Sequence, residues 1–148
     1  MSETVSPPLA RVLPWRDPLA AFSAFEAEDW CLLLHDGQSG RARIFARPDE
    51  VVTGEGLAEF AIFAERFRKT ESGLWAGLFG YDLAGAFERL PELGQVWQAL
   101  RMAHYPVWAE LDRDAAEIRV HGAPGAAVEA FVEALERPYQ AVPVPAGK

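Results

Sequence analysis

Cysteine and histidine are scarce in this sequence. Cys31 is the single cysteine among 148 residues, so the chain cannot form an internal disulfide. A chain without disulfides suits a reducing compartment, and we expect a cytoplasmic protein. Cys31 lies within an apolar run, which favours a buried thiol over a reactive nucleophile. The three histidines, His35, His104 and His121, lack the spacing of metal ligands, so no metal site is expected.

Long apolar runs and an excess of basic charge are also missing. No stretch approaches the ~18 consecutive apolar residues of a membrane-spanning helix. The first residues, MSETVSPPLARVLPW, have neither the basic start nor the apolar centre of a signal peptide. The net charge of −8 argues against nucleic acid, and the lack of a basic run argues against an anionic membrane surface. P-loop, GxSxG and dinucleotide-binding motifs do not occur either.

The sequence does contain enough apolar material for one folded domain. Half of the residues are hydrophobic, which is too apolar for a disordered chain, and the length suits a single core. We expect a flexible N-terminus over residues 1–10 and one domain over 11–137. The prolines of 138–148 indicate a linker or a frayed tail.

The hydrophobic pattern alternates between the periods of strands and helices. Asp17-Pro18 is typical of a helix start, and the apolar spacing after it predicts a helix to about Glu28. Further helices are expected over 56–69, 93–103 and 124–137, and strands over 11–15, 30–35, 41–47, 51–53, 74–80, 105–111 and 117–120. Two hairpins with interspersed helices indicate an α+β fold of mainly antiparallel β-sheet layers with flanking helices.

Three of these segments carry more detailed predictions. The run 30–35 is expected to be a strand buried on both faces. In 41–47 the three arginines and Phe45 share one face, and Ala42, Ile44 and Ala46 share the other. The helix over 56–69 is expected to turn five apolar residues toward the core: Leu57, Phe60, Ile62, Phe63 and Phe67.

The stretch Leu74–Glu92, LWAGLFGYDLAGAFERLPE, combines an apolar run with a tight turn. Gly77 and Gly80 interrupt the run, as expected where another backbone or side chain comes close. This pattern predicts a buried strand that enters the turn.

The turn itself contains several polar residues. Asp82 stands where a helix N-cap belongs, ahead of a short helical turn that includes Phe87. The strand and the capped turn together would fix Tyr81 rigidly. Asp82 and Glu88 could form an acid–base pair, but they are six residues apart across the turn and have no reason to face each other. A helix cap and a surface charge are therefore the favoured interpretation.

The segment 77–92, GLFGYDLAGAFERLPE, closely resembles the GLFGYDL…FE.LPE signature in the N-terminal region of aminodeoxychorismate synthase component I. Asp29–Gly37, DWCLLLHDG, is similar to the WA.LLH.G segment of that region, and Pro106–Asp114, PVWAELDRD, is similar to a third block. The segments follow in the family's order, and the resemblance extends from about Pro14 to Leu135. Anthranilate synthase component I, a paralogue, is similar in these segments too; the Leu34-His35 pair favours the aminodeoxychorismate enzyme.

The resemblance implies a function as well as a fold. The family's enzymes convert chorismate to 4-amino-4-deoxychorismate, for p-aminobenzoate and folate biosynthesis, with ammonia from a glutaminase component II and a Mg²⁺ ion. The residues that hold chorismate and Mg²⁺ are implied to lie in a C-terminal half of the enzyme, which these 148 residues do not include. We therefore expect a non-catalytic N-terminal domain with no catalytic residue and no cofactor of its own. Its sheets would be completed by that later half, as in the N-terminal domain of anthranilate synthase component I.

A tryptophan pocket is implied by the same resemblance. The family holds tryptophan in this region, as a feedback inhibitor or as a structural ligand, and the matching positions are Leu34, His35, Asp36, Ser39, Arg41 and Arg43. Such a pocket needs an apolar slot and an anion for the ammonium group of the ligand, and Asp36 could supply that anion. A plain β-turn is the alternative role of Asp36-Gly37, because relatives often have serine at the aspartate position and a longer turn.

Three functions stay open on these grounds. The chain would complete the chorismate-binding half of component I, act as a tryptophan-binding regulatory module, or serve as a structural interaction domain for the glutaminase subunit. Under the first, the isolated domain should expose an apolar strip where the other half docks.

Overall fold

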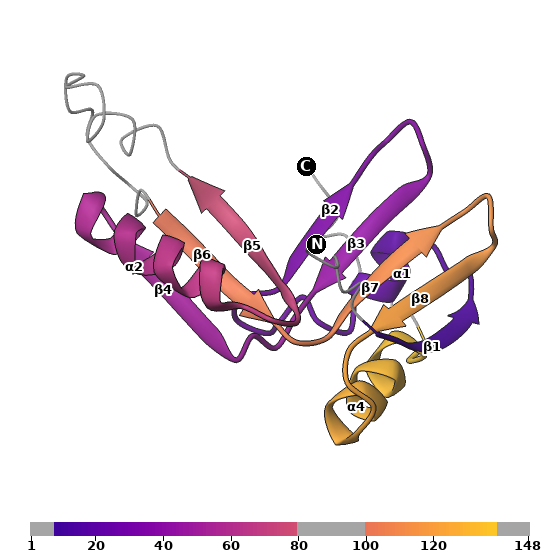
Figure 1. Ribbon diagram of the computed structural model, residues 1–148. Helices are drawn as coiled ribbons and strands as arrows, with labels where there is room; N and C mark the ends of the chain where they lie inside the picture. The colour runs from indigo at the N-terminus through magenta and orange to yellow at the C-terminus, as the bar shows by residue number, and fades with distance from the viewer. Residues whose placement is uncertain (1–7, 80–99, 139–148) are drawn as a thin grey trace, which may run out of the picture.

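The computed structural model describes residues 8–79 and 100–138. Within them the chain forms an α+β fold with two antiparallel sheets, which confirms the predicted fold class (Figure 1). The strands are β1 (Leu9–Pro14), β2 (Leu32–His35), β3 (Arg41–Phe45), β4 (Glu50–Gly54), β5 (Leu74–Phe79), β6 (Leu100–Tyr105), β7 (Trp108–Asp112) and β8 (Glu117–His121). The helices of the described residues are α1 (Pro18–Phe22), α2 (Leu57–Lys69) and α4 (Ala126–Leu135).

The larger sheet has five strands in the order β1-β8-β7-β3-β2. Both predicted hairpins belong to it, because β2 pairs with β3 and β7 pairs with β8. The hairpins join through β3 and β7, whose register sets Arg41 opposite Asp112 and Arg43 opposite Glu110. Strand β1 closes one edge against β8.

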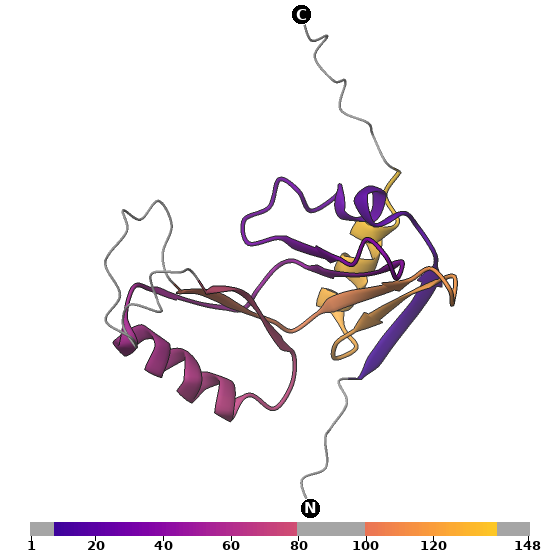
Figure 2. The same ribbon diagram turned by 90° about the horizontal axis from the view of Figure 1, so that it is seen from above.

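Helices α1 and α4 lie on one face of this sheet (Figure 2). The predicted alternation in β3 explains why: Ala42 and Ile44 are buried beneath the helices, whereas Arg41 is exposed on the other face. Phe25, which follows α1, contacts Phe131 of α4 with ring centroids 4.9 Å apart. Both rings are almost completely buried, so they anchor the helical layer to the sheet.

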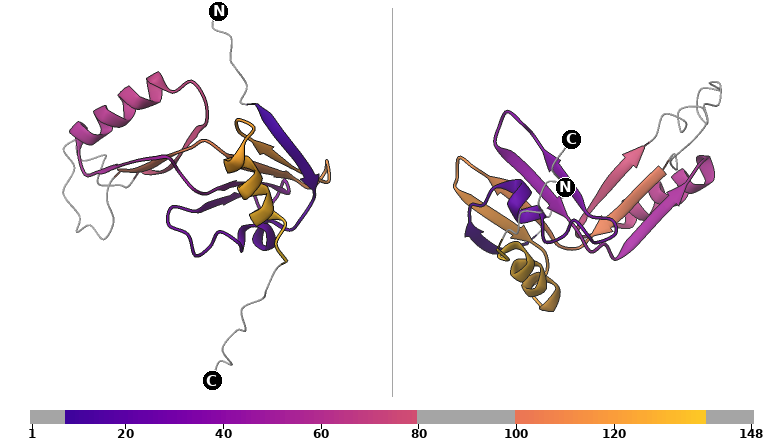
Figure 3. Two further views of the ribbon diagram at one scale, coloured as in Figure 1. Left: turned by 90° about the horizontal axis from the view of Figure 1, so that it is seen from below. Right: turned by 180° about the vertical axis from the view of Figure 1, so that it is seen from behind.

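The smaller sheet has three strands in the order β4-β6-β5, and α2 packs against one face of it. Phe63 of α2 is buried there against Val52, Leu100 and Met102. Strand β6 continues into β7 at Pro106, and the two sheets diverge from this connection like the arms of a V (Figures 1 and 3).

An aromatic cluster lies where the two sheets meet. Phe45, Tyr105 and Trp108 are buried together, and Trp30 and Leu32 pack against them. The Tyr105 hydroxyl donates a hydrogen bond to the Trp30 carbonyl at 2.7 Å. Trp30 has a φ of 61°, which is unusual for a bulky residue, so this bond helps to hold a strained turn at the entrance to β2.

Tyr105 gives a prediction for alkaline pH. Burial raises the pKa of the Tyr105 phenol to about 12, and the charge of Cys31 adds to this shift. An unfolded chain loses the same proton near pH ~10, so the stability contributed by the neutral phenol declines as pH rises above that value. We expect the free energy of unfolding to fall more steeply above pH ~10 in the wild type than in Tyr105→Phe. Urea unfolding across this range measures both slopes, and equal slopes would contradict the prediction.

One predicted helix is wrong in its described part. Leu100–Ala103, expected as the end of a helix over 93–103, belong to β6, the central strand of the smaller sheet. A central strand is apolar on both faces, and periodicity cannot distinguish such a short run from a buried helix segment. In β6, Leu100 and Ala103 are fully buried on opposite faces of the sheet. Residues 93–99 lie outside the described part of the chain.

The helix that begins at Pro18 is shorter than predicted. Asp17 caps it as expected, accepting from the Leu19 N–H at 3.0 Å, but the helix ends at Phe22 and turns follow up to Trp30. Phe25 is nevertheless buried. The helical spacing of the apolar residues therefore places Phe25 in the core from a turn, without a longer helix.

Two predictions of burial also fail. The strand expected over 30–35 begins at Leu32, and Leu34 is 48% exposed, because β2 is an edge strand and no helix of the described residues covers its outer face. In α2 the predicted helix is confirmed, but Phe63 is its one buried residue, whereas Leu57, Ile62 and Phe67 of the expected core face are exposed. A three-stranded sheet contacts only a narrow stripe of the helix surface.

Several element boundaries differ by a few residues. Strand β1 begins at Leu9, inside the segment 1–10 that was expected to be flexible. Strand β7 begins at Trp108, because Tyr105 ends β6 and Pro106 has no N–H for a strand pairing. Helix α4 lies within the predicted range 124–137.

Candidate functional site

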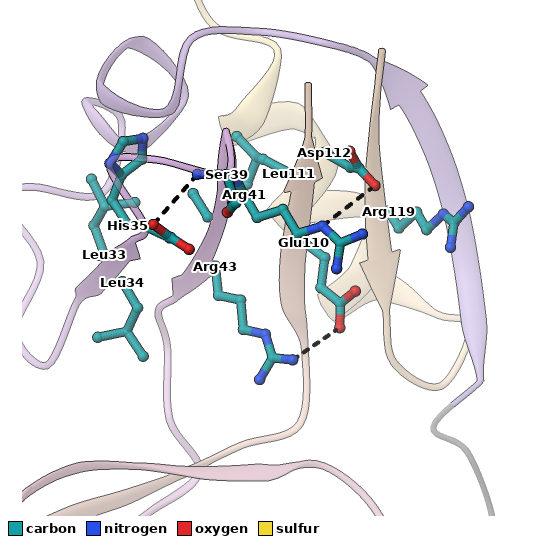
Figure 4. Close-up of a pocket in the computed structure, with 12 residues that line it drawn as sticks. Leu33, Leu34, His35, Ser39, Arg41, Arg43, Glu110, Leu111, Asp112 and Arg119 are labelled. Atoms are coloured by element: carbon teal, nitrogen blue, oxygen red, sulfur yellow. Dashed lines mark hydrogen bonds and ion pairs between the residues drawn. The ribbon is translucent and has the colours of Figure 1, made fainter. Parts of the chain in front are cut away.

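All six residues of the expected ligand pocket line one hollow of about 760 Å³ at the tips of the two hairpins (Figure 4). This volume lies within the ~300–1,000 Å³ that is typical of small-molecule sites. Leu34, His35 and Asp36 come from the end of β2 and the turn after it, and Ser39, Arg41 and Arg43 come from the turn and β3. Residues of β7 and β8 complete the lining, among them Glu110, Asp112 and Arg119.

The register of the sheet explains why these side chains converge. Leu34 lies opposite Arg43, Arg43 lies opposite Glu110, and Glu110 lies opposite Arg119. Directly opposed residues of antiparallel strands project from the same face. His35 lies opposite Ala42, so its side chain projects from the other face, and it is the least suited of the six to contact a ligand beside Leu34 and Arg43.

Asp36 both closes the turn between β2 and β3 and places a carboxylate at this hollow. Its Oδ1 accepts from the Gln38 N–H at 2.9 Å and from the Ser39 N–H at 3.4 Å, which closes the turn between β2 and β3. The bond from the Gln38 N–H and the further bonds from Ser39 hold the pKa of Asp36 below its usual value. The turn role is therefore present, and the same bonds keep an exposed anion at the mouth of the hollow.

The two arginines of the pocket extend toward acidic partners on β7 that hold them only loosely. Arg41 Nε lies 4.0 Å from Asp112 Oδ2, and a guanidinium nitrogen of Arg43 lies 3.8 Å from Glu110 Oε1. Both distances exceed the length of a hydrogen bond, and exposed ion pairs of this kind contribute at most ~1 kcal/mol to stability. A carboxylate ligand could therefore take over either guanidinium at low cost.

The arrangement suits a small zwitterion. Arg41 or Arg43 would bind its carboxylate, Asp36 would bind its ammonium group, and Leu34 would contact its apolar part. Glu110, Asp112 and Arg119 were not identified from the sequence. Their alternating charges are also typical of a plain exposed hairpin, and only the pairing of β3 with β7 brings them to the pocket.

The described part of the chain gathers no set of metal ligands, and Cys31 is a weak nucleophile. Within residues 8–79 and 100–138, no three His, Cys, Asp or Glu side chains are grouped to hold a metal ion. Cys31 is partly buried, and burial raises the pKa of its thiol, so it is mainly protonated at neutral pH.

The glycine-containing stretch is described in part. Gly77 lies in β5 against β6, and a Cβ there would overlap the Arg101 carbonyl oxygen, so the expected close approach of another backbone is present. Gly80, Tyr81, Asp82, Phe87 and Glu88 lie outside the described residues.

The sequence matches no protein-family model and no curated protein. Among the described residues, no helix has the length and apolar character needed to cross a membrane.

Proposed function

We propose that this chain is a non-catalytic N-terminal domain of an aminodeoxychorismate synthase component I and completes the fold of a chorismate-binding half. Three sequence segments in the family's order support this proposal. On the face of the larger sheet opposite α1 and α4, Phe45 and Trp108 are buried against the smaller sheet. The structural observation that supports the proposal best is the rest of this face, which no described residue covers. We call this surface the open face.

The open face has a charged centre and an apolar rim. Its centre consists of paired charges on β3, β7 and β8: Arg41, Arg43, Glu110, Asp112, Glu117 and Arg119. Leu34 on β2 and Val12 on β1 flank them and are 48% and 50% exposed. The face is thus not the continuous apolar strip that was expected. A mixture of charged and apolar side chains is nevertheless typical of surfaces that bind another folded protein.

An association experiment tests the proposal. The chorismate-binding half of an aminodeoxychorismate synthase component I, expressed as a separate chain, is titrated with this chain by calorimetry. We expect binding, and product formation from chorismate, ammonia and Mg²⁺ only when the chorismate-binding half is present. Product formed by this chain alone, or no binding between the two chains, would refute the proposed function.

A matched pair of variants tests the role of the open face. Arg43→Glu reverses a charge at the centre of the open face, next to Glu110. Two adjacent carboxylates would then face the chorismate-binding half, and its affinity for this chain should fall at least ~10-fold. Arg68→Glu reverses a charge on α2, where Arg68 pairs with Glu65 at 2.9 Å, and should change binding less than ~2-fold. Equal effects of both variants would show that the open face is not the docking surface.

The pocket supports a second candidate function, a regulatory module that binds tryptophan. Asp36 allows its two roles to be separated. Asp36→Asn keeps an oxygen that closes the turn but removes the anion, whereas Asp36→Ala removes both. We expect Asp36→Asn to weaken tryptophan binding ~10-fold or more and to lower the melting temperature slightly, and Asp36→Ala to weaken binding as much and to lower the melting temperature further. Calorimetry and thermal unfolding measure the two effects; wild-type protein that binds no tryptophan at millimolar concentration would exclude this function.

The lowered pKa of Asp36 predicts the pH dependence of the turn. The contribution of its carboxylate to stability is present above pH ~4, where the unfolded chain is ionised, and is lost as pH falls through the lower folded pKa. The melting temperatures of wild type and Asp36→Asn should therefore converge at acid pH. A difference that grows on acidification would contradict this sign.

A further inference from the structure

His104 of β6 joins three segments that are distant in the sequence. Its Nδ1 lies 2.6 Å from Oδ1 of Asp49, the residue before β4, and its Nε2 lies 2.7 Å from the carbonyl oxygen of Ser72, in the turn between α2 and β5. The Asp49 N–H also donates to the His104 carbonyl at 3.1 Å. The imidazole is 13% exposed and is therefore held mainly by protein atoms. We call His104, Asp49 and the Ser72 carbonyl the clasp.

Both partners of the imidazole ring are acceptors. A carbonyl oxygen and an ionised carboxylate have no proton to donate. A neutral imidazole carries one N–H, whereas the imidazolium carries two. The protonated ring can satisfy both short contacts. The neutral ring would turn an unprotonated nitrogen toward an oxygen at less than 3 Å, and one of the two contacts would be lost.

Other charged side chains lie near the imidazole ring, but no direct contact between them and the ring is found among the described residues. The adjacent hollow of about 340 Å³ is lined by Glu50 from β4, by Arg66 and Lys69 from α2, and by Glu71 from the following turn. Arg66 pairs with Glu50, and Lys69 lies 3.0 Å from Glu65. On β5 the Trp75 ring packs against the imidazole with centroids 5.3 Å apart. Asp49 is thus the carboxylate that contacts His104 directly.

The turn that the clasp holds is shaped around the ring. Gly73 has a φ of +80°, and a Cβ at this position would overlap Nε2 of His104. The same turn is tied to β5, because Trp75 Nε1 donates to the Thr70 hydroxyl at 2.8 Å. Release of the Ser72 carbonyl would therefore loosen the connection between α2 and the smaller sheet.

We propose that the clasp is a pH-sensitive lock between the α2–β5 turn and the smaller sheet. It is closed while both ring nitrogens of His104 carry protons, and it opens when one proton is lost. Histidine is the side chain whose charge changes between about pH 5 and 8. The lock therefore holds while the imidazole carries both protons and releases when a rise in pH removes one of them. It lies on the smaller sheet and does not depend on the open face or on the pocket.

Amide hydrogen exchange of the full chain at pH 5.5 and pH 8 tests the lock, with protection factors that correct for the intrinsic pH dependence. In the wild type we expect the protection of the Asp49 and Thr70 amides to fall ~10-fold at the higher pH, as for the loss of one charged hydrogen bond. His104→Gln should show low protection at both pH values. His35→Gln alters an exposed histidine of β2 and should behave like the wild type.

Asp49→Asn gives the sharpest test. The Asn amide can donate to Nδ1 while Nε2–H donates to Ser72, so a neutral ring satisfies both contacts. Protection should then stay high at pH 8. Nitrogen-15 spectra of the wild-type ring should show two N–H groups at pH 5.5, and this measurement needs no variant. Three results would overturn the proposal. The first is a neutral ring at pH 5.5, and the second is amide protection in the wild type that does not change with pH. The third is a pH-dependent loss of protection that persists in Asp49→Asn or in a folded His104→Gln.

Discussion

Gly77→Ala is expected to lower the free energy of unfolding by about 3 kcal/mol or more. Gly77 lies opposite Met102 in the pairing of β5 with β6. An added Cβ would overlap the Arg101 carbonyl oxygen and lie 2.9 Å from the Met102 Cα. These atoms belong to the backbone of a central strand, which is bound on both sides and cannot move aside as a flexible side chain can. The methyl group must therefore separate β5 from β6.

Urea unfolding measures this loss, and Gly37→Ala is the matched control. No atom lies within 4 Å of a Cβ at Gly37, so the control should change stability by less than ~0.5 kcal/mol. Hydrogen exchange should also show weaker protection of the β5 amides in the Gly77 variant. A Gly77→Ala protein as stable as the control would mean that β5 and β6 are not paired in this register.

Phe131→Ala is expected to cost about 3–5 kcal/mol, the usual range for the removal of a buried aromatic side chain. Phe131 is 1% exposed in α4 and packs against Phe25, which is fully buried. Its removal leaves a cavity between α4, the turn after α1 and the sheet. Because Phe25 lines the same cavity, Phe25→Ala and the double variant should show non-additive losses.

Phe67→Ala makes the same chemical change at an exposed position. Phe67 is 58% exposed on α2, so its truncation should cost no more than ~1 kcal/mol. Urea unfolding of the variants compares the costs directly. A similar loss in the Phe67 and Phe131 variants would contradict the assignment of the core to the layer between α4 and the larger sheet.

The features that the sequence predicted correctly are local ones. The alternation of arginine with alanine and isoleucine in 41–45 identifies both the strand and its buried face, because side chains of a strand alternate with a period of two. Gly77 was identified for the same kind of reason, since a glycine inside an apolar run marks a close backbone approach. Asp17-Pro18 correctly marks a helix start, although the helix ends early.

The pocket shows where prediction from the sequence stops. Its predicted residues lie within one hairpin, and residues 34–43 necessarily stay close together when that hairpin forms. Glu110, Asp112 and Arg119 join them only because β3 pairs with β7. Nothing in either hairpin alone specifies that pairing. The exposed side of β2 is a similar case, because an apolar run does not reveal whether its strand will lie at an edge.

Residue spacing along the chain was enough to predict the class of fold, both hairpins, the inward face of β3 and the glycine at the β5–β6 contact. Each of these depends on residues a few positions apart, whose spacing is set by the geometry of a single strand or turn. Only the folded chain shows that residues 100–103 form a central strand, that the described residues leave part of one face of the larger sheet exposed, and that His104 meets Asp49 and Ser72. These depend on which strands become neighbours, and that choice is made by packing between segments far apart in the chain.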